Sequence, residues 1–275
     1  MIKLIAFDLD GTLLTTDKKI TPRTYDALKN AAGQGVHIVP ATGRFLRTVP
    51  QEIKDMDFVD CIISINGAYV IDMKTGEEIY RSEIPVNEAI DIMSFFDTMP
   101  VAYDCYMNND SFINQKMMDE IESYVDDRFY LDLVWKHRKG VPELKEHIRA
   151  SGHDIQKIMA YTKDMEIKRY LMDNLESMFP GLKVTSSIKN NVEINASGAD
   201  KGKALEAVAQ YFHIDISETM GFGDSYNDIP LLRAAGTGVC MGNGNDVTKS
   251  SADIIAPSND DDGVAQIIEE MVLIH

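Results

Sequence analysis

Residues 2–12 of the chain are Ile2-Lys3-Leu4-Ile5-Ala6-Phe7-Asp8-Leu9-Asp10-Gly11-Thr12. The short apolar run predicts a buried β-strand, and Asp-x-Asp-Gly-Thr at its end predicts a turn that collects two carboxylates, loop amides and a hydroxyl. Open α/β sheets carry their chemistry at the carboxyl ends of strands. Asp and Gly are also ordinary turn residues, so a functional interpretation depends on matching pieces further along the chain.

Strand and helix signals alternate after this turn. Thr21 and Pro22 are typical of a helix start, and a helix is expected over about residues 22–34. Apolar runs at 36–40 and 61–65 predict two more strands, with a helix from about Arg44 to Lys54 between them. This βαβαβ order predicts parallel strands joined by right-handed crossovers. The same rhythm returns from Asp200, with helices expected at 201–212, 229–235 and 263–271.

The middle of the chain has a different pattern. It mixes hairpin signals with amphipathic helices, and residues 117–150 are expected to be irregular or helical. We therefore predict an α/β fold with a Rossmann-like parallel-sheet core built from residues 1–83 and 191–275. An inserted α+β domain is expected at residues 84–190.

The composition restricts the kinds of binding partner and the cellular location that we expect. The net charge of −17 argues against nucleic acids and anionic membranes, because both attract basic surfaces. The three cysteines, Cys61, Cys105 and Cys240, are widely spaced and are expected to be reduced thiols. No signal peptide is visible and no apolar stretch approaches the roughly 18 residues of a membrane span. These features predict a cytoplasmic protein.

Three further polar sites follow predicted strands. The first is Ala41-Thr42-Gly43-Arg44, where a hydroxyl and loop amides at an expected helix N-terminus would bind an anion, although Thr42 is also an ordinary helix cap. The second is Lys201, a cation in the first turn of a helix, where the helix dipole disfavours it unless an anion is near. The third is Gly223-Asp224-Ser225-Tyr226-Asn227-Asp228, whose polar crowding exceeds what helix capping requires.

These groups make chemical sense together. Two or three carboxylates predict a Mg²⁺ site, because Mg²⁺ prefers oxygen ligands. A lysine, a threonine hydroxyl and loop amides would neutralise the oxygens of a phosphoryl group. No His or Cys lies near these motifs, so zinc and thiol chemistry are not expected. A carboxylate beside a metal can itself act as a nucleophile and form an aspartyl-phosphate.

The four motifs, in this order, resemble the haloacid dehalogenase superfamily of phosphatases. They are Asp8–Thr12, Thr42, Lys201 and Gly223–Asp228. Ala41–Arg44, Ser64-Ile65-Asn66-Gly67-Ala68 and Gly242-Asn243-Gly244 are similar to its Cof-type hydrolases, which carry a large α/β cap. The resemblance covers the whole chain. It implies that residues 84–190 are a cap that closes over the phosphate and selects the leaving group, with hinges near Ser82–Pro85 and Asn190–Val192.

The resemblance also implies roles for the two N-terminal carboxylates. Asp8 attacks phosphorus and is a Mg²⁺ ligand. Asp10 protonates the leaving oxygen and later deprotonates the attacking water, and its backbone carbonyl is a second ligand. Asp224 is the third metal ligand, and Asp228 orients the metal shell or Lys201.

The phosphoryl group is expected to bind to other members of the set. The resemblance implies contacts from Thr42, from the amides of Leu9 and Gly43, and from Asn227, while Lys201 offsets the charge of Asp8 and phosphate. Arg44 and Asn66 are supporting residues. Candidate substrate selectors on the cap hairpins are Tyr106, Asn108, Asn109, Asn114 and Lys189, although each is more readily explained as an ordinary surface or core residue.

The residue at position 10 favours hydrolysis over other fates of the phosphoryl group. Relatives that keep a long-lived aspartyl-phosphate, such as those resembling P-type ATPases, have Thr there, whereas this chain has Asp10. We therefore predict a Mg²⁺-dependent phosphatase that hydrolyses small phosphorylated metabolites, sugar phosphates first among them, as a monomer or weak homodimer. The alternatives are a phosphomutase or phosphotransferase of the same superfamily, and a non-catalytic regulator that binds phosphate ligands.

Overall fold

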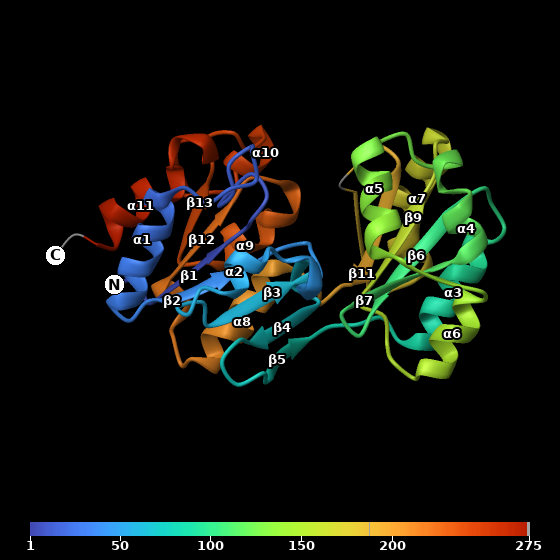
Figure 1. Ribbon diagram of the computed structural model, residues 1–275, viewed down its shortest axis with the longest axis horizontal. Helices are drawn as coiled ribbons and strands as arrows, with labels where there is room; N and C mark the ends of the chain where they lie inside the picture. The colour runs from blue at the N-terminus through green and yellow to red at the C-terminus, as the bar shows by residue number, and fades with distance from the viewer. Residues whose placement is uncertain (187, 274–275) are drawn as a thin grey trace. The chain divides into compact units, whose positions relative to one another are not determined.

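In a computed structural model of the chain, which describes residues 1–186 and 188–273, the apolar run after Lys3 forms strand β1, Leu4–Phe7. The chain divides into two units: Met1–Arg81 with the segment from Ala199 onward, and Ser82–Gly198 (Figure 1). The predicted fold class, a parallel-sheet core with an inserted α+β domain, is confirmed. No helix among the described residues is both long and apolar enough to cross a membrane.

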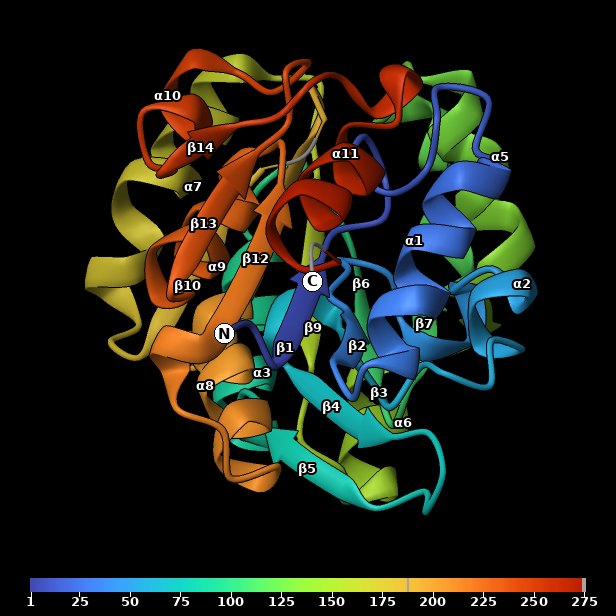
Figure 2. The ribbon, with the colours of Figure 1, turned by 90° about the vertical axis from the view of Figure 1, so that its left-hand side faces the viewer.

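The first unit is built on a parallel sheet in the order β14-β13-β12-β1-β2 (Figure 2). Its strands are β1, β2 (His37–Pro40), β12 (Thr219–Gly223), β13 (Thr237–Cys240) and β14 (Ile254–Ile255). Its helices are α1 (Pro22–Gly33), α2 (Gln51–Lys54), α8 (Lys201–Tyr211), α9 (Ile229–Ala234), α10 (Asp246–Lys249) and α11 (Gly263–Met271). Thr21 caps α1, as expected, by accepting a hydrogen bond from the amide of Thr24.

Alternation along β1 explains the layers around this sheet. Ile5 and Phe7 pack into a cluster with residues of α1 and α11, whereas Leu4 and Ala6 pack against α8. Both faces are therefore covered, as expected of a parallel sheet. Asp8 and Asp224, which directly follow β1 and β12, are left at the carboxyl edge.

The strand expected at residues 61–65 belongs to a second, antiparallel sheet and not to the parallel sheet of this unit. Its three strands are β3 (Cys61–Ser64), β4 (Tyr69–Asp72) and β5 (Glu78–Arg81). β3 still runs parallel to β2, to which isolated bridges at Ala41–Ile63 and Ile38–Val59 join it. The hairpin partner β4 takes most of the hydrogen-bonding capacity of β3 along its other edge.

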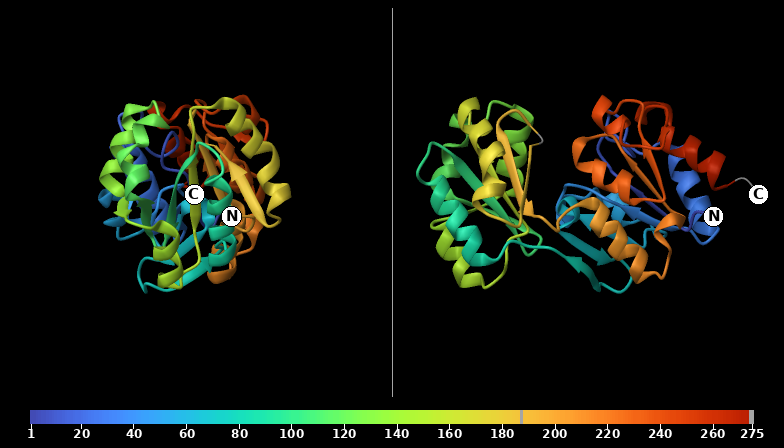
Figure 3. Two further views of the ribbon diagram at one scale, coloured as in Figure 1. Left: turned by 90° about the vertical axis from the view of Figure 1, so that its right-hand side faces the viewer. Right: turned by 180° about the vertical axis from the view of Figure 1, so that it is seen from behind.

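The second unit, drawn in green to yellow in Figure 3, contains a six-stranded sheet in the order β10-β11-β9-β6-β7-β8. Its strands are β6 (Ala102–Met107), β7 (Asp110–Asn114), β8 (Lys139–Val141), β9 (Lys157–Tyr161), β10 (Leu182–Thr185) and β11 (Asn191–Ala196). Its helices are α3 (Val86–Phe96), α4 (Gln115–Asp119), α5 (Arg128–His137), α6 (Leu144–Ser151) and α7 (Met165–Met178). α3, α6 and α7 cover one face through a continuous apolar cluster. The sequence prediction for 117–150 missed the short strand β8.

The second boundary between the units lies later than expected. The prediction began the returning core at residue 191, but Asn191–Ala196 pairs antiparallel with both β9 and β10. The inserted unit therefore extends to Gly198, and the chain crosses back at Ala199 rather than near Asn190–Val192. The first boundary, at Arg81, is close to the expected one.

Candidate active site

A buried ion-pair chain lies at the carboxyl edge of the first sheet. Asp8 follows β1 directly and is 6% exposed. Nζ of Lys201 donates to Oδ1 of Asp8 at 2.6 Å and to Oδ1 of Asp228 at 2.5 Å. The Lys201 side chain is fully buried, so the two carboxylates replace the water around its ammonium group. The counter-anion expected for this first-turn lysine is therefore present in the protein itself.

Asp224 is held against Asp8 by small and polar neighbours. Its Oδ1 accepts from the hydroxyl of Thr12 and its Oδ2 from that of Ser225, each at 2.9 Å. Gly11 has φ +87°, and a Cβ built on it would lie 2.7 Å from Oδ2 of Asp224. Glycine at this position permits both the backbone conformation and the close approach of the β1 and β12 loops.

The two carboxylate oxygens of Asp228 have different hydrogen-bond partners. Its Oδ2 accepts from the backbone amides of Asp224 and Ser225, each at 2.9 Å, which caps the 3₁₀ turn Tyr226–Asp228. Its Oδ1 binds Lys201. Asp228 therefore caps this turn and is also a member of the ion-pair chain.

The three carboxylates form a site that fits a hard cation. One oxygen each of Asp8, Asp224 and Asp228 lies within 4.8 Å of the other two. Burial, together with the charges of Asp228 and Asp224, raises the pKa of Asp8 to about 7 despite Lys201, and burial and Asp228 raise the pKa of Asp224. Three carboxylates facing one ammonium leave an excess of negative charge, which a divalent cation with oxygen ligands would neutralise.

The carboxylate of Asp10 lies in a different environment. Arg44 binds it with two hydrogen bonds of 2.8 Å, and Nζ of Lys18 donates to Oδ1 at 2.9 Å. Burial alone would raise the pKa of Asp10, but the hydrogen bonds and charges of Arg44 and Lys18 outweigh it and lower the pKa. The side chain of Asp10 is thus paired with two cations and is not one of the three clustered carboxylates. The predicted use of its backbone carbonyl as a metal ligand stays a prediction.

Lys18 was missed by the sequence prediction. It lies in a polar loop with a second lysine beside it, so nothing in the sequence distinguishes it from a surface residue. The chain folds back on itself at residues 15–19, where the amide of Thr15 donates to the carbonyl of Lys19 and the amide of Lys18 donates to the carbonyl of Thr15. This turn brings Lys18 to Asp10.

The loop after β2 does not begin a helix, contrary to the prediction for residues 44–54. A 3₁₀ turn at Leu46–Thr48 is followed by the single turn of α2, because Pro50 interrupts the hydrogen-bonding pattern. Thr42 is 1% exposed, and its hydroxyl accepts from the amide of Arg44 at 3.2 Å. The interpretation of Thr42 as a helix cap is therefore wrong, and an anion here would be bound by loop groups alone.

Asn66 and Asn227 join this loop from two other segments. Nδ2 of Asn227 donates to Oδ1 of Asn66 at 3.1 Å. A Cβ built on Gly43 would lie 2.8 Å from the same Oδ1 of Asn66, so Gly43 is in close contact with the Asn66 amide. The side chain of Leu9 is fully buried in the core, which leaves only its backbone at the edge of the sheet.

The candidate selectors in the second unit have structural contacts of their own. The ring of Tyr106 lies under the guanidinium of Arg138, and Asn114 caps α4. Asn108 and Asn109 have positive φ in the β6–β7 hairpin, and the carbonyl of Lys189 accepts from Nζ of Lys168. Tyr106 and Asn114 thus have structural contacts, and a role of any of these residues in substrate selection stays a prediction.

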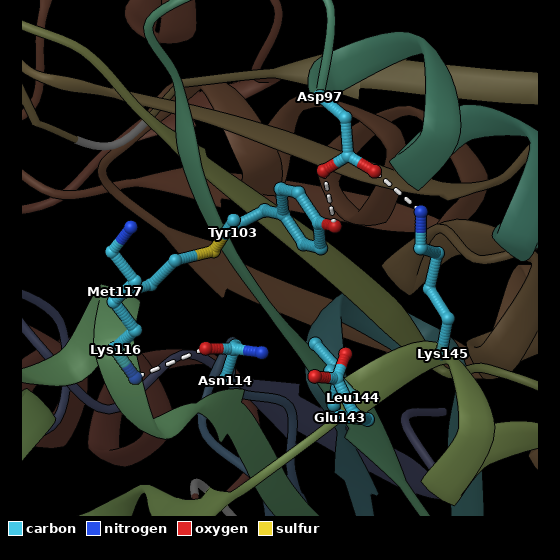
Figure 4. Close-up of a pocket in the computed structure, with 8 residues that line it drawn as sticks. All are labelled: Asp97, Tyr103, Asn114, Lys116, Met117, Glu143, Leu144 and Lys145. Carbon is cyan, nitrogen blue, oxygen red and sulfur yellow. Dashed lines mark hydrogen bonds and ion pairs between the residues drawn. The ribbon is translucent and has the colours of Figure 1, made fainter.

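The second unit also contains a pocket of about 260 Å³ (Figure 4). Three of its polar groups pair with one another: Asp97 accepts from Tyr103 and is ion-paired with Lys145. The pocket is lined by Asp97, Tyr103, Asn114, Lys116, Met117, Glu143, Leu144 and Lys145. It contains equal numbers of acidic and basic side chains, so its charge favours no one class of ligand.

Comparison with known proteins gives a consistent answer. A sequence model of haloacid dehalogenase-like hydrolases matches residues 5–268. The 5-amino-6-(5-phospho-D-ribitylamino)uracil phosphatase of Bacillus subtilis is 30% identical over 272 residues, which cover 99% of this chain and 96% of that protein. The pyridoxal phosphate phosphatase of Escherichia coli is 28% identical over 287 residues, covering 97% of each. A solved subclass IIB sugar phosphatase of the superfamily, 25% identical, has a TM-score of 0.81 and covers 99% of this chain and 100% of its own.

Proposed function

The chain belongs to the haloacid dehalogenase-like hydrolases and is a phosphatase, and from this premise we propose that it hydrolyses sugar phosphates through an aspartyl-phosphate on Asp8. The observation that carries the proposal is the cluster of Asp8, Asp224 and Asp228, in which buried Lys201 is paired with Asp8 and Asp228. The relatives act on small phosphorylated compounds, as their names state.

Two displacements at phosphorus account for the reaction. A carboxylate oxygen of Asp8 attacks phosphorus, the bond from phosphorus to the alcohol oxygen breaks, and Asp10 gives that oxygen a proton. Water then attacks the phosphorus of the aspartyl-phosphate, Asp10 takes a proton from the water, and the bond to Asp8 breaks to release inorganic phosphate. Lys201 fixes the Asp8 carboxylate through Oδ1 during both steps.

Asp10 has to exchange partners to serve as the acid. Its ion pairs with Arg44 and Lys18 favour the carboxylate form in the protein without substrate. An incoming phosphate dianion competes for the same two cations, which frees Asp10 to hold a proton. Thr42, the amides of Leu9 and Gly43, and Asn227 complete the proposed phosphate contacts.

Mg²⁺ is the proposed cation. Asp8 and Asp224 would hold it together with the backbone carbonyl of Asp10, while Asp228 orients Asp224 and Lys201 through its own hydrogen bonds. When bound, the cation supplies positive charge opposite the transferring phosphoryl group. The oxygen-only donor set within the cluster fits Mg²⁺ better than a soft metal.

Location and partners are proposed from composition and thiol state. The three cysteines are buried and form no disulfide, which supports reduced thiols and a cytoplasmic location. A net charge of −17 supports a small-molecule substrate without a nucleic-acid or membrane partner. We propose a monomer or weak homodimer.

The test is a panel of about a hundred phosphate monoesters assayed with Mg²⁺, with Asp8→Asn as the blank. Sugar phosphates are expected to turn over fastest, and an acid-quenched sample with ³²P-labelled substrate should carry label on the wild-type protein. Products should be the alcohol and inorganic phosphate. An isomerised sugar phosphate would instead indicate a phosphomutase, and turnover equal to that of Asp8→Asn would contradict the proposal.

A further inference from the structure

Residues 65–67 form a turn in a conformation that its sequence does not favour. Ile65, Asn66 and Gly67 have consecutive φ values of +52°, +56° and +94°. Asparagine and glycine tolerate this left-handed region, but a β-branched residue rarely adopts it. Ile65 and Gly67 are fully buried or nearly so, and Asn66 is 9% exposed, so the surrounding contacts impose the conformation. Those contacts identify what the turn is for.

The first contact is with the loop after β2. The amide of Asn66 donates to the carbonyl of Thr42 at 3.0 Å, and the amide of Ile65 donates to the carbonyl of Arg44 at 2.9 Å. The amide of Thr42 in turn donates to the carbonyl of Ile63 at 2.8 Å. Backbone hydrogen bonds on both sides of Gly43 therefore hold this loop on the turn.

The second and third contacts reach the other phosphate-site segments. The Asn66 side chain accepts from Nδ2 of Asn227 at 3.1 Å while lying against Gly43. A Cβ on Gly67 would lie 2.3 Å from the carbonyl oxygen of Asp200 and 3.0 Å from the nitrogen of Lys201. The backbone of Gly67 thus packs directly on the start of α8, which carries the lysine of the ion-pair chain.

We propose that the 65–67 turn sets the spacing of the phosphate-binding groups, and that Asn66 is a positioning residue that acts through Asn227. The inference rests on the proposed function, because it takes Thr42, Gly43, Asn227 and Lys201 as the groups that bind phosphate. One hydrogen of the Asn227 amide binds Asn66, and the second is then directed by that bond. Loss of the Asn66 side chain leaves Asn227 free to rotate.

The experiment is a double-mutant cycle read by the affinity for inorganic phosphate, measured by calorimetry with Mg²⁺ present. Asn66→Gly keeps the left-handed backbone and removes only the amide side chain. It should weaken phosphate binding about tenfold, as expected for one hydrogen bond. Asn227→Ala should weaken binding to a similar extent, and the double variant should be no weaker than Asn227→Ala alone.

His213→Gly is the matched control, because His213 has φ +57° at the end of α8 and makes none of these contacts. It should bind phosphate as the wild type does. Asn66→Ser, whose side chain is too short to reach Asn227, gives the same cycle if Asn66→Gly does not fold.

Two outcomes would overturn the inference while leaving the phosphatase intact. They are unchanged phosphate affinity in folded Asn66→Gly, and a double variant whose loss equals the product of the two single losses. A wild-type protein that neither hydrolyses phosphate monoesters nor binds phosphate would overturn the proposed function and the inference together.

Discussion

Nζ of Lys201 lies 2.6 Å from Oδ1 of Asp8, and both groups are shielded from solvent. Burial alone would lower the pKa of Lys201, but the charges and hydrogen bonds of Asp228 and Asp8 raise it. The lysine is therefore a permanent cation that fixes two carboxylates. Stability and proposed reactivity depend on the same atoms.

Replacing Lys201 with Met should destabilise the protein and stop turnover. Asp8 and Asp228 would lose their counter-ion in a buried site, which typically costs about 3–5 kcal/mol. The loss in the free energy of unfolding should be smaller at pH 5.5 than at pH 8, because the stranded carboxylates take up protons. Urea denaturation at the two pH values measures it. Lys203→Met, with a side chain 49% exposed on the same helix, is the control and should change stability by less than about 0.5 kcal/mol.

Cation binding should release a proton from Asp8. The pKa of Asp8 in the folded protein is about 7, against an ordinary value of 3.8. The protonated form of Asp8 stabilises the folded protein fully below pH 3.8, and this stabilisation is lost as the pH rises through 7. The metal-free protein should therefore become less stable as the pH rises from 3.8 to about 7. Affinity for Mg²⁺ should rise about tenfold per pH unit below pH 7 and level off above it.

Calorimetry in two buffers of different ionisation enthalpy measures the protons released per cation. About one proton is expected at pH 6 and almost none at pH 8.5, and Asp8→Asn should remove this release. Release that is the same at both pH values would contradict the assignment.

Gly11→Ala should impair the cation site more than the fold. Gly11 and Gly35 both have φ +87°, but only at Gly11 does a Cβ meet other atoms, those of Asp224 at 2.7–3.1 Å. Gly35→Ala should cost only the strain of a left-handed alanine, about 1–2 kcal/mol. Gly11→Ala should cost more and should also weaken Mg²⁺ binding by displacing Asp224. Thermal unfolding and Mg²⁺ titration of both variants test this, and equal Mg²⁺ affinities would show that Asp224 is not a ligand.

Asp10→Asn should slow turnover by roughly 10²–10⁴-fold, the usual contribution of a general acid and base. Mg²⁺ affinity should be nearly unchanged, because the Asp10 side chain is paired with Arg44 and Lys18 and is not one of the three clustered carboxylates. Steady-state kinetics and Mg²⁺ titration separate the two effects. Asp17→Asn, an exposed carboxylate of the same loop, should leave both unchanged. A parallel loss of Mg²⁺ affinity and rate in Asp10→Asn would contradict the acid–base role.

The sequence predicted the strand ends well and the loop conformations poorly. β1, α1 and α8 are local structures with clear apolar periodicity and caps, so their patterns sufficed. Pro50 was visible in the sequence and should have ended the helix expected at 44–54. The boundary at residue 191 was wrong because the alternation of apolar and polar residues in β11 predicts a strand but not the sheet to which it belongs. Only its pairing with β9 and β10 assigns β11 to the second unit.

Two contacts at the site could not be predicted from the sequence: that of Lys18, which was missed, and that of Asn66, which was expected only as a supporting residue. Lys18 reaches Asp10 through a loop, and Asn66 reaches Asn227 through a strained turn. Neither contact follows from residue spacing along a helix or strand, so no periodic pattern in the sequence predicts it. Asp8, Thr42 and Asp224, in contrast, follow strands of one parallel sheet, which brings their carboxyl ends together.

A buried ion pair in the second unit gives a prediction that is independent of catalysis. Nε of Arg138 and the hydroxyl of Tyr161 donate to Oδ2 of Asp104 at 2.7 and 2.5 Å, and both charged side chains are almost fully buried. Oδ1 of Asp104 is buried without a hydrogen-bond partner among the described residues. Such a pair is costly to break, whereas replacing both members with apolar side chains is far less costly.

Arg138→Met should therefore lower the free energy of unfolding by about 3–5 kcal/mol, because it leaves the Asp104 carboxylate unpaired. The double variant Asp104→Leu/Arg138→Met should recover most of that loss. Trp135, the single tryptophan, lies in α5 of this unit, so urea denaturation followed by its fluorescence measures the change. Arg149→Met, at a position 53% exposed on α6, should have an effect within about 0.5 kcal/mol. A double variant as unstable as Arg138→Met would show that packing of the arginine stem, rather than its charge, stabilises this unit.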